Sequence, residues 1–429
     1  MREKFRAGTT YRVEGPACVR VIEGEIESLG KVLRPREQLV VPKSKAMSFT
    51  VLKDSLLEVR LGDGARMEEI KEPPIPPDWR AAIERILAMP KPVKVLVLGD
   101  VDSGKSTFCI CLANASIGKG FKTVIIDKDL GQSDIGAPTT IGMGLVTSAV
   151  TSLSQVSPID GYFVGLTSPS RVTHRVIAGV QLLMEKALNM GTEVIIVNTS
   201  GWIAGKEARE LKWSLISVLK PNAIVAIQRS TEIEHLVRPF KSIRGIEIIR
   251  VPSPPIVRMR NRGERRMLRE SSYKRYLEGA KIRTFSLSQV GLLYTIYGTG
   301  MSLSRDVLRE LSETIGVRIL YGEEATDAVL LVAERPIRLS EEDMKTIRGK
   351  FGGKDVVLTY KGGEEGLLVG LLDTDGRLLG IGIVKEIEFE RGIIRILTNV
   401  EGDVSMIAFG QIKLDENGRE LRKFDGWVL

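Results

Sequence analysis

Residues 93–107 read VKVLVLGDVDSGKST, an apolar strand-like run that leads directly into the pattern G-x-x-x-x-G-K-S. A helix-compatible stretch, 107–115, follows. This order of strand, loop and helix distinguishes a true phosphate-binding loop from a chance match. The two glycines let successive backbone N–H groups turn toward an anion, and the helix that begins near Lys105 adds the positive end of its dipole. The sequence therefore predicts that the chain binds a nucleoside triphosphate.

Every residue of this loop is a candidate nucleotide ligand. Lys105 is placed to reach the β- and γ-phosphates, and the Ser106 hydroxyl to join the shell of a Mg²⁺ ion. The expected cofactor is Mg²⁺, and the expected co-substrate is ATP or another triphosphate such as GTP. The candidate nucleotide-binding residues are Gly99, Asp100, Val101, Asp102, Ser103, Gly104, Lys105, Ser106 and Thr107.

The composition is that of a folded protein with two or three domains. The chain has 429 residues, of which 43% are hydrophobic and 27% charged. Four of its first six residues are charged, and no run approaches the length of a membrane span, so we expect a cytoplasmic protein without membrane association. Three cysteines and two histidines make a zinc site or a disulfide framework improbable.

The net charge of +8 has a dense local component. Basic residues crowd the segment 258–275, where only Glu264 and Glu270 oppose them. Such a patch suits a polyanion, either a triphosphate or a nucleic acid, although a solvated helix face is the alternative. The basic residues are Arg258, Arg260, Arg262, Arg265, Arg266, Arg269, Lys274 and Arg275.

The hydrophobic pattern predicts an α/β protein with three folded parts. Residues 1–70 show short, closely spaced β segments (11–13, 18–22, 38–41, 48–51 and 57–61) and indicate an N-terminal β-sandwich. The proline-rich residues 71–78 form a linker. Residues 79–285 alternate candidate strands (93–98, 123–126, 161–164, 193–197, 223–227 and 247–251) with helical stretches, which predicts a mostly parallel sheet. Residues 286–429 form a β-rich C-terminal domain with a helix at 305–315.

A second acidic motif follows the strand at 123–126 and reads DKDLGQ over 127–132. Two carboxylates at positions i and i+2 off a strand end point in the same direction, toward the phosphate-binding loop. Asp127 can assist Ser106 in holding Mg²⁺, while Asp129 can accept the proton of an attacking hydroxyl group. For Asp127 a merely structural role at the strand end is the alternative.

These motifs resemble those of the RNA 5'-hydroxyl polynucleotide kinases, a family that includes the kinase subunit of the eukaryotic pre-mRNA cleavage complex, a nucleolar rRNA-processing kinase and archaeal relatives. The segment 162–169 (YFVGLTSP) resembles the family's segment after the third strand, and 198–202 (NTSGW) matches its T-x-G-W clasp. Arg260, Arg265 and Arg269 have the spacing of its arginine-rich lid. The central part is thereby identified as a P-loop polynucleotide kinase domain.

The resemblance implies a role for each matched residue. Asp129 is the base that deprotonates the 5'-hydroxyl group, Lys105 holds the donor, and Arg265 stabilises the transition state. Arg260 and Arg269 bind donor phosphates. The implied RNA-binding residues are Gln132, Thr167, Ser168, Thr199, Gly201 and Trp202, with a buried strand-end aromatic as the alternative for Trp202 and loop capping for Thr167 and Ser168.

The resemblance implies a polynucleotide 5'-hydroxyl kinase that transfers the γ-phosphate of ATP to RNA, with DNA as a second acceptor, in RNA processing or repair. RNA-processing proteins are the expected partners of the β domains. Two other functions stay open. One is a non-catalytic, ATP-binding scaffold subunit, which is disfavoured because the lid and base residues are present. The other is a P-loop GTPase or metal-insertion ATPase, which leaves the clasp and the arginines unexplained.

Overall fold

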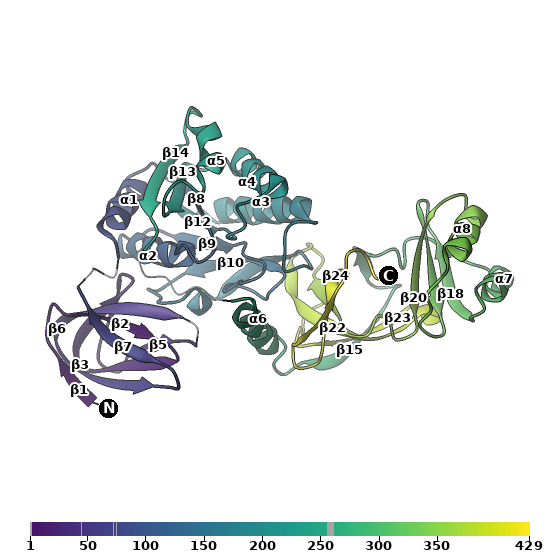
Figure 1. The fold of residues 1–429 in the computed structure, drawn as a ribbon, viewed down its shortest axis with the longest axis horizontal. Coiled ribbons are helices and arrows are strands. Elements are labelled where there is room, and N and C mark those ends of the chain that lie inside the picture. The colour runs from purple at the N-terminus through teal and green to yellow at the C-terminus, as the bar shows by residue number, and fades with distance from the viewer. Residues whose placement is uncertain (1, 44, 72, 74, 255–260) are drawn as a thin grey trace. The chain divides into compact units, whose positions relative to one another are not determined.

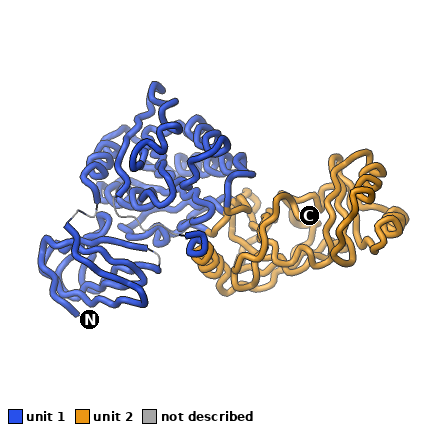
Figure 2. Tube along the Cα trace, in the orientation of Figure 1, with its two compact units in different colours: residues 1–136, 140–162, 168–265 blue, residues 137–139, 163–167, 266–429 orange. Residues whose placement is uncertain are grey.

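The structure is a computed structural model that describes residues 2–43, 45–71, 73, 75–254 and 261–429. Arg258 and Arg260 lie outside the described residues. The chain divides into two compact units (Figure 2). The first unit comprises residues 1–136, 140–162 and 168–265, and the second comprises residues 137–139, 163–167 and 266–429.

The N-terminal strands form one antiparallel sheet of seven strands (Figure 1). Alternate side chains such as Val19, Val21 and Leu57 point into its core. The predicted strands 48–51 and 57–61 belong to a single strand, β6, whose exposed residues 52–54 interrupt the apolar alternation. The strands are β1 (Arg2–Phe5), β2 (Thr10–Glu14), β3 (Ala17–Ser28), β4 (Lys31–Leu33), β5 (Gln38–Val41), β6 (Ala46–Leu61) and β7 (Arg66–Ile70).

The sheet that carries the phosphate-binding loop has the order β11-β10-β9-β12-β8-β13-β14. Its neighbours from β9 to β14 pair in parallel, which confirms the predicted α/β class with a mostly parallel central sheet. The strands are β8 (Val93–Gly99), β9 (Thr123–Asp127), β10 (Thr140–Val146), β11 (Pro158–Phe163), β12 (Val194–Asn198), β13 (Ala223–Gln228) and β14 (Glu247–Pro252).

Helices cover both faces of this sheet, so its strands are apolar at almost every position. Val95 and Val97 pack with α1 (Pro77–Leu87) and α2 (Lys105–Gly118), while Leu96, on the other face, is equally buried. Figure 1 shows α3 (Thr173–Asn189) and α4 (Lys206–Leu219) across the sheet from α2. Two short helical turns, α5 (Glu234–Val237) and η2 (Arg238–Phe240), follow β13, and η1 (Leu153–Gln155) precedes β11.

Sequence reasoning missed β10, which pairs antiparallel with β9. Two glycines weaken its strand pattern, and one of them is required by packing. A Cβ atom on Gly142 would lie 1.7 Å from the backbone oxygen of Ile135. Gly142 therefore weakens the strand pattern in the sequence, and it is also the residue that allows the backbone of Ile135 to approach β10 closely.

The C-terminal sequence forms two sheets. One has seven strands: β15 (Lys281–Ser286), β16 (Gly291–Leu293), β21 (Leu367–Leu372), β22 (Leu378–Glu388), β23 (Ile393–Thr398), β24 (Met406–Leu414) and β25 (Glu420–Lys423). The other has four: β17 (Met301–Ser302), β18 (Ile319–Glu324), β19 (Ala328–Ala333) and β20 (Asp355–Tyr360). The helices are α7 (Arg305–Ile315), as predicted, α8 (Glu341–Lys350) and the short η3 (Phe389–Arg391).

Strand β19 explains why this part reads as β-rich without a strict alternation. Leu330 and Val332 pack into the core of the seven-stranded sheet, whereas Val329 and Leu331 pack with α7 and α8. All six of its residues are buried. The β-rich character that the sequence predicted for 286–429 is confirmed.

The helix α6 (Arg262–Tyr276) crosses the division between the two units, since the second unit begins at Arg266. The next strand, β15, pairs with β23 of the C-terminal sheet. The domain boundaries at residues 70, 78 and 285 stay a prediction. Among the described residues, no helix has both the length and the apolar character that a membrane crossing requires.

Candidate functional site

The predicted phosphate-binding loop joins β8 to α2, and its backbone passes through left-handed conformations. Asp102 has a φ of 52° and Gly104 a φ of 97°, directly before α2 begins at Lys105. A Cβ atom on Gly99 would lie 2.7 Å from the backbone oxygen of Ile227. Glycine is therefore required at 104 by conformation and at 99 by close packing. This geometry suits a loop whose N–H groups converge on an anion.

The buried ring of Trp79 packs against the phosphate-binding loop. The ring of Trp79 would lie 3.0 Å from a Cβ atom on Gly104, and it meets Phe108 edge-on with the ring centroids 5.2 Å apart. Its Nε1 donates to the backbone oxygen of Pro252 at 2.8 Å. Sequence reasoning missed Trp79, because its position directly after the proline-rich linker belongs to no motif.

Lys105 lies inside the loop rather than in solvent. It is 7% exposed, and its Nζ donates to the backbone oxygen of Asp100 at 2.5 Å. Burial lowers the pKa of Lys105, and the carboxylate of Asp129 is the largest charge that opposes this shift. The predicted donor-binding cation and the predicted base therefore lie within electrostatic reach of one another, and Asp129 is itself only partly buried.

Asp127 is fully buried, and both of its carboxylate oxygens accept hydrogen bonds. Oδ2 accepts the N–H groups of Asp134 (2.8 Å) and Ile135 (3.2 Å). Oδ1 accepts the N–H group of Asp129 at 3.3 Å. Burial, together with the nearby carboxylates of Asp134 and Asp129, raises the pKa of Asp127 to about 7. Asp127 therefore fixes the conformation of the loop that carries Asp129.

Asn198 connects the two predicted metal-site residues. Its Nδ2 donates to Oδ1 of Asp127 at 3.0 Å and to Oγ of Ser106 at 3.3 Å. The connection follows from topology, because β12 lies between β9 and β8 and ends at the same edge of the sheet. The sequence places Asn198 at the end of a strand beside the clasp motif, but that position alone assigns no function to it.

The clasp segment lies against the phosphate-binding loop. A Cβ atom on Gly201 would lie 2.5 Å from the backbone nitrogen of Val101, so the two loops are in direct backbone contact. Thr199 is fully buried, and its Oγ1 donates to the backbone oxygen of Val97 at 2.8 Å. The fully buried Lys212 of α4 donates from Nζ to the backbone oxygen of Ser200 at 2.8 Å. Trp202 is half-buried.

Arg265, at the start of α6, contacts both motifs. Its Nη2 lies 3.0 Å from Oδ2 of Asp102 in the phosphate-binding loop. Its backbone oxygen accepts a hydrogen bond from Nε2 of Gln132 at 3.1 Å. The Arg265 side chain is 29% exposed and that of Asp102 is 3% exposed. The predicted lid arginine is therefore directed at the loop predicted to hold the phosphates.

The family model for the P-loop of the mRNA cleavage and polyadenylation factor CLP1 matches residues 99–279. The polyribonucleotide 5'-hydroxyl-kinase of Pyrococcus horikoshii is 33% identical over 360 residues, which cover 83% of this chain and 95% of that protein. This chain belongs to the polyribonucleotide 5'-hydroxyl-kinase family. The resemblance that the motifs predict is confirmed.

Further members of the polyribonucleotide 5'-hydroxyl-kinase family agree. The relative from Methanocaldococcus jannaschii is 32% identical over 357 residues, covering 82% of this chain and 95% of that protein. The structure of the wild-type Clp1p–Pcf11p complex matches with a TM-score of 0.63 at 12% identity, covering 96% of this chain and 97% of the matched chain. That likeness supports the fold: a P-loop domain together with β-rich parts.

The remaining site residues predicted from the kinase family make other contacts. Arg260 is outside the described residues. Arg269 belongs to the second unit, where its Nε lies 2.6 Å from Oε1 of Glu420. Thr167 accepts a hydrogen bond from Lys423 at 2.8 Å, and the exposed Ser168 has its hydroxyl 3.2 Å from that of Ser170. Their roles toward nucleotide or RNA stay predictions.

Proposed function

We propose that this chain is a polynucleotide 5'-hydroxyl kinase that transfers the γ-phosphate of ATP, or of another nucleoside triphosphate, to the 5'-hydroxyl group of RNA. The observation that carries this proposal is the convergence of Lys105, Asp129 and Arg265 on one loop. The charge of Asp129 acts on Lys105, and Arg265 pairs with Asp102 at 3.0 Å. A donor cation, a base and an arginine are what phosphoryl transfer requires from a protein.

The donor is held by the phosphate-binding loop, with Lys105 on its β- and γ-phosphates. Asp129 accepts the proton of the 5'-hydroxyl group while that oxygen forms a bond to the γ-phosphorus. The bond from the γ-phosphorus to the β-phosphate oxygen breaks, and the nucleoside diphosphate leaves. Arg265 exchanges the Asp102 carboxylate for the transferring phosphoryl group and stabilises its charge.

The oxygen atoms of Ser106 and Asp127 fit a Mg²⁺ site. Both accept from the same Asn198 amide, so they lie at one edge of the sheet. Asp127 already accepts backbone N–H groups on both oxygens, which favours support of the ion through water rather than direct ligation. Bound there, Mg²⁺ neutralises charge on the donor phosphates.

The acceptor strand is held beside the clasp by Gly201 and Trp202, with Gln132 next to the first turn of α6, while the buried Thr199 shapes the clasp through its hydrogen bond to Val97. Backbone contact between Gly201 and Val101 supports this assignment because it joins the acceptor side of the site to the donor side. Work on RNA, with DNA as a second acceptor, suits the net charge of +8. RNA-processing protein partners bound through the β-rich parts, and a cytoplasmic location, are further expectations.

Incubation with γ-labelled ATP tests the proposal directly. Matched RNA and DNA oligonucleotides with a 5'-hydroxyl end are compared with the same RNA carrying a 5'-phosphate, and Lys105→Ala serves as the inactive control. Label must enter the 5'-hydroxyl RNA and be absent from the 5'-phosphorylated RNA. Nucleotide binding without any transfer would instead support the scaffold function.

A further inference from the structure

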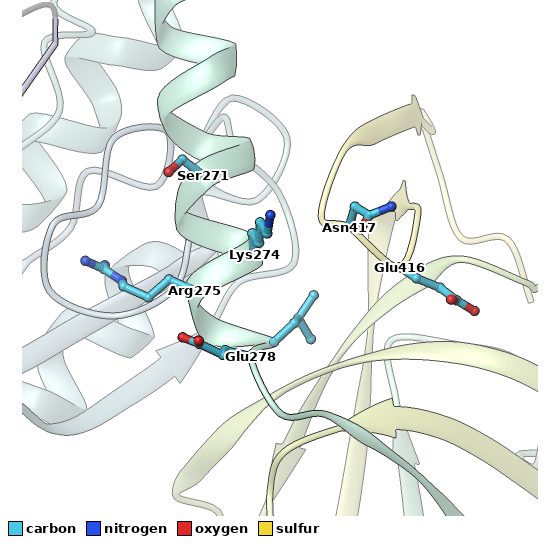
Figure 3. A pocket seen from close by; sticks show the side chains of 7 residues that line it. Ser271, Lys274, Arg275, Glu278, Glu416 and Asn417 are labelled. Carbon is cyan, nitrogen blue, oxygen red and sulfur yellow. The ribbon is translucent and has the colours of Figure 1, made fainter.

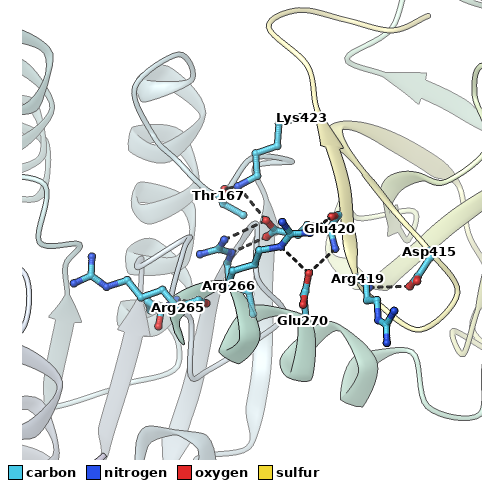
Figure 4. Close-up of polar contacts among 10 residues, drawn as sticks. Thr167, Arg265, Arg266, Glu270, Asp415, Arg419, Glu420 and Lys423 are labelled. Atoms are coloured by element: carbon cyan, nitrogen blue, oxygen red, sulfur yellow. Dashed lines mark hydrogen bonds and ion pairs between the residues drawn. The ribbon is translucent and has the colours of Figure 1, made fainter. Parts of the chain in front are cut away.

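Strand β25, near the end of the C-terminal sheet, carries a buried carboxylate that faces the lid helix α6. Glu420 is 7% exposed. Its carboxylate accepts from Nε of Arg269 at 2.6 Å and from Nη2 of the same side chain at 3.1 Å. Figure 4 shows Glu420 together with Arg266 and Glu270 of this helix. This two-point geometry fixes the guanidinium plane as well as its position, which a single contact cannot do.

The backbone of Glu420 is bound to the same helix. Its N–H group donates to Oε1 of Glu270 at 3.1 Å, and its carbonyl oxygen accepts from Nη2 of Arg266. Arg266 and Glu270 also pair with each other at 2.9 Å. Glu420 therefore forms hydrogen bonds with three charged side chains of α6. The helix can neither slide nor rotate there without breaking several of these hydrogen bonds at once.

The turn that precedes β25 adds a steric restraint. Gly418 has a φ of 80°, and a Cβ atom on it would lie 2.8 Å from the backbone nitrogen of Lys274. Beside this contact a cavity of about 380 Å³ lies between the end of α6 and the turn, where Lys274 and Asn417 are among the side chains that line it (Figure 3). Gly418 and Glu420 therefore contact α6 at two separate points.

The other end of β25 reaches a second functional segment. Nζ of Lys423 donates to Oγ1 of Thr167 at 2.8 Å, and it lies 3.3 Å from Oε2 of Glu420. The chain before Thr167 is held by the same sheet, because the backbone nitrogen of Gln411 donates to the oxygen of Gly165 at 3.0 Å. Thr167 is a predicted RNA-binding residue, and Lys423 orients its side chain.

We propose that Glu420 and Lys423 are positioning residues for phosphoryl transfer, Glu420 for the lid helix and Lys423 for the Thr167 loop. This inference rests on the proposed kinase function. Arg265 lies one turn before Arg269 on the same helix, so a restraint on Arg269 also limits where Arg265 can lie. Small displacements of such groups are costly to the rate, because catalysis depends on alignment.

Glu420→Gln, Lys423→Met and the control Arg422→Gln provide the test. Arg422 is an exposed charge between the two positions. Glu420→Gln is expected to lower kcat about tenfold, because Arg265 loses its alignment when the restraint on Arg269 is weakened. Lys423→Met is expected to raise KM for RNA about fivefold at unchanged kcat, with recovery in Lys423→Arg. Arg422→Gln should match the natural protein.

Each rate is referred to the concentration of active sites, measured by nucleotide titration, and thermal unfolding of every variant is recorded. A kcat for Glu420→Gln equal to that of the natural protein overturns the lid part of the inference. So does a fall that disappears after correction for active sites, since it reports lost folding. An unchanged KM in Lys423→Met overturns the second part. Absence of RNA phosphorylation by the natural protein refutes the proposed function itself.

Discussion

The carboxyl edge of the central sheet and strand β25 of the C-terminal sheet use charge in different ways. At the central edge, Lys105 begins α2, Asp127 ends β9 and Asp129 lies in the loop that follows, and burial shifts the pKa of the first two. On β25, Glu420 meets Arg269 in a fully matched pair. Burial opposes the charges of Lys105 and Asp127 at the first place, whereas at the second the charges of Glu420 and Arg269 pair with each other and hold α6. The proposed function therefore uses both buried charges at the sheet edge and an ion pair that holds the lid helix.

Asp129→Asn is expected to have the largest effect among variants at the edge of the central sheet. Loss of the base should lower kcat by about 10⁴-fold, because the amide cannot take the proton of the 5'-hydroxyl group, while nucleotide affinity stays unchanged. Single-turnover phosphorylation of RNA measures it. Asp306→Asn is the control, since that exposed carboxylate of α7 lies 4.0 Å from Arg309. A fully active Asp129→Asn enzyme would remove Asp129 from the base role.

Arg265→Ala comes next. An arginine that meets the transferring phosphoryl group contributes at least about 10³-fold to kcat, and we expect a loss of that size with little change in nucleotide affinity. Arg262→Ala, an exposed residue at the first position of α6, is the control. Equal losses in the two variants would mean that general helix charge, rather than a directed guanidinium group, is responsible.

Gly201→Ala tests whether the donor and acceptor loops must touch. The new methyl group meets the backbone nitrogen of Val101 at 2.5 Å, so one loop has to move. We expect kcat/KM for RNA to fall by about 10²-fold. Gly118→Ala is a suitable control because nothing lies within 4 Å of its Cβ position. A Gly201→Ala enzyme with natural kinetics would separate the two loops functionally.

The smallest expected effect is on stability at low pH, through the pair of Glu420 and Arg269. Burial alone would raise the pKa of Glu420, but the hydrogen bonds of Arg269 lower it below 4.5. The ionised group therefore stabilises the fold above pH 4.5 and loses this effect as the pH falls through its lowered pKa. At pH 7, the free energy of unfolding of Glu420→Gln should be about 2 kcal/mol lower than that of the natural protein. Denaturant titrations should show that difference shrinking toward pH 3, and a constant difference contradicts the pairing.

The contrast also explains how far the sequence could be interpreted. The phosphate-binding loop, the D-x-D motif and the clasp are local patterns, so the central strands and the candidates Lys105 and Asp129 could be predicted from spacing and resemblance. Trp79 and Asn198 could not, because their importance depends on which strands end side by side. Glu420 and Lys423 lie far from their partners along the chain, and no local pattern relates them to Arg269 or Thr167.

The second unit is discontinuous in sequence, since residues 137–139 and 163–167 join 266–429. During synthesis these early segments leave the ribosome on the order of tens of seconds before Gln411, to which Gly165 hydrogen-bonds. The hydrogen bond between these two residues can form only after Gln411 has been synthesised. Cutting the gene at the start of α6 would therefore divide the second unit between two polypeptides and separate the partners of this hydrogen bond.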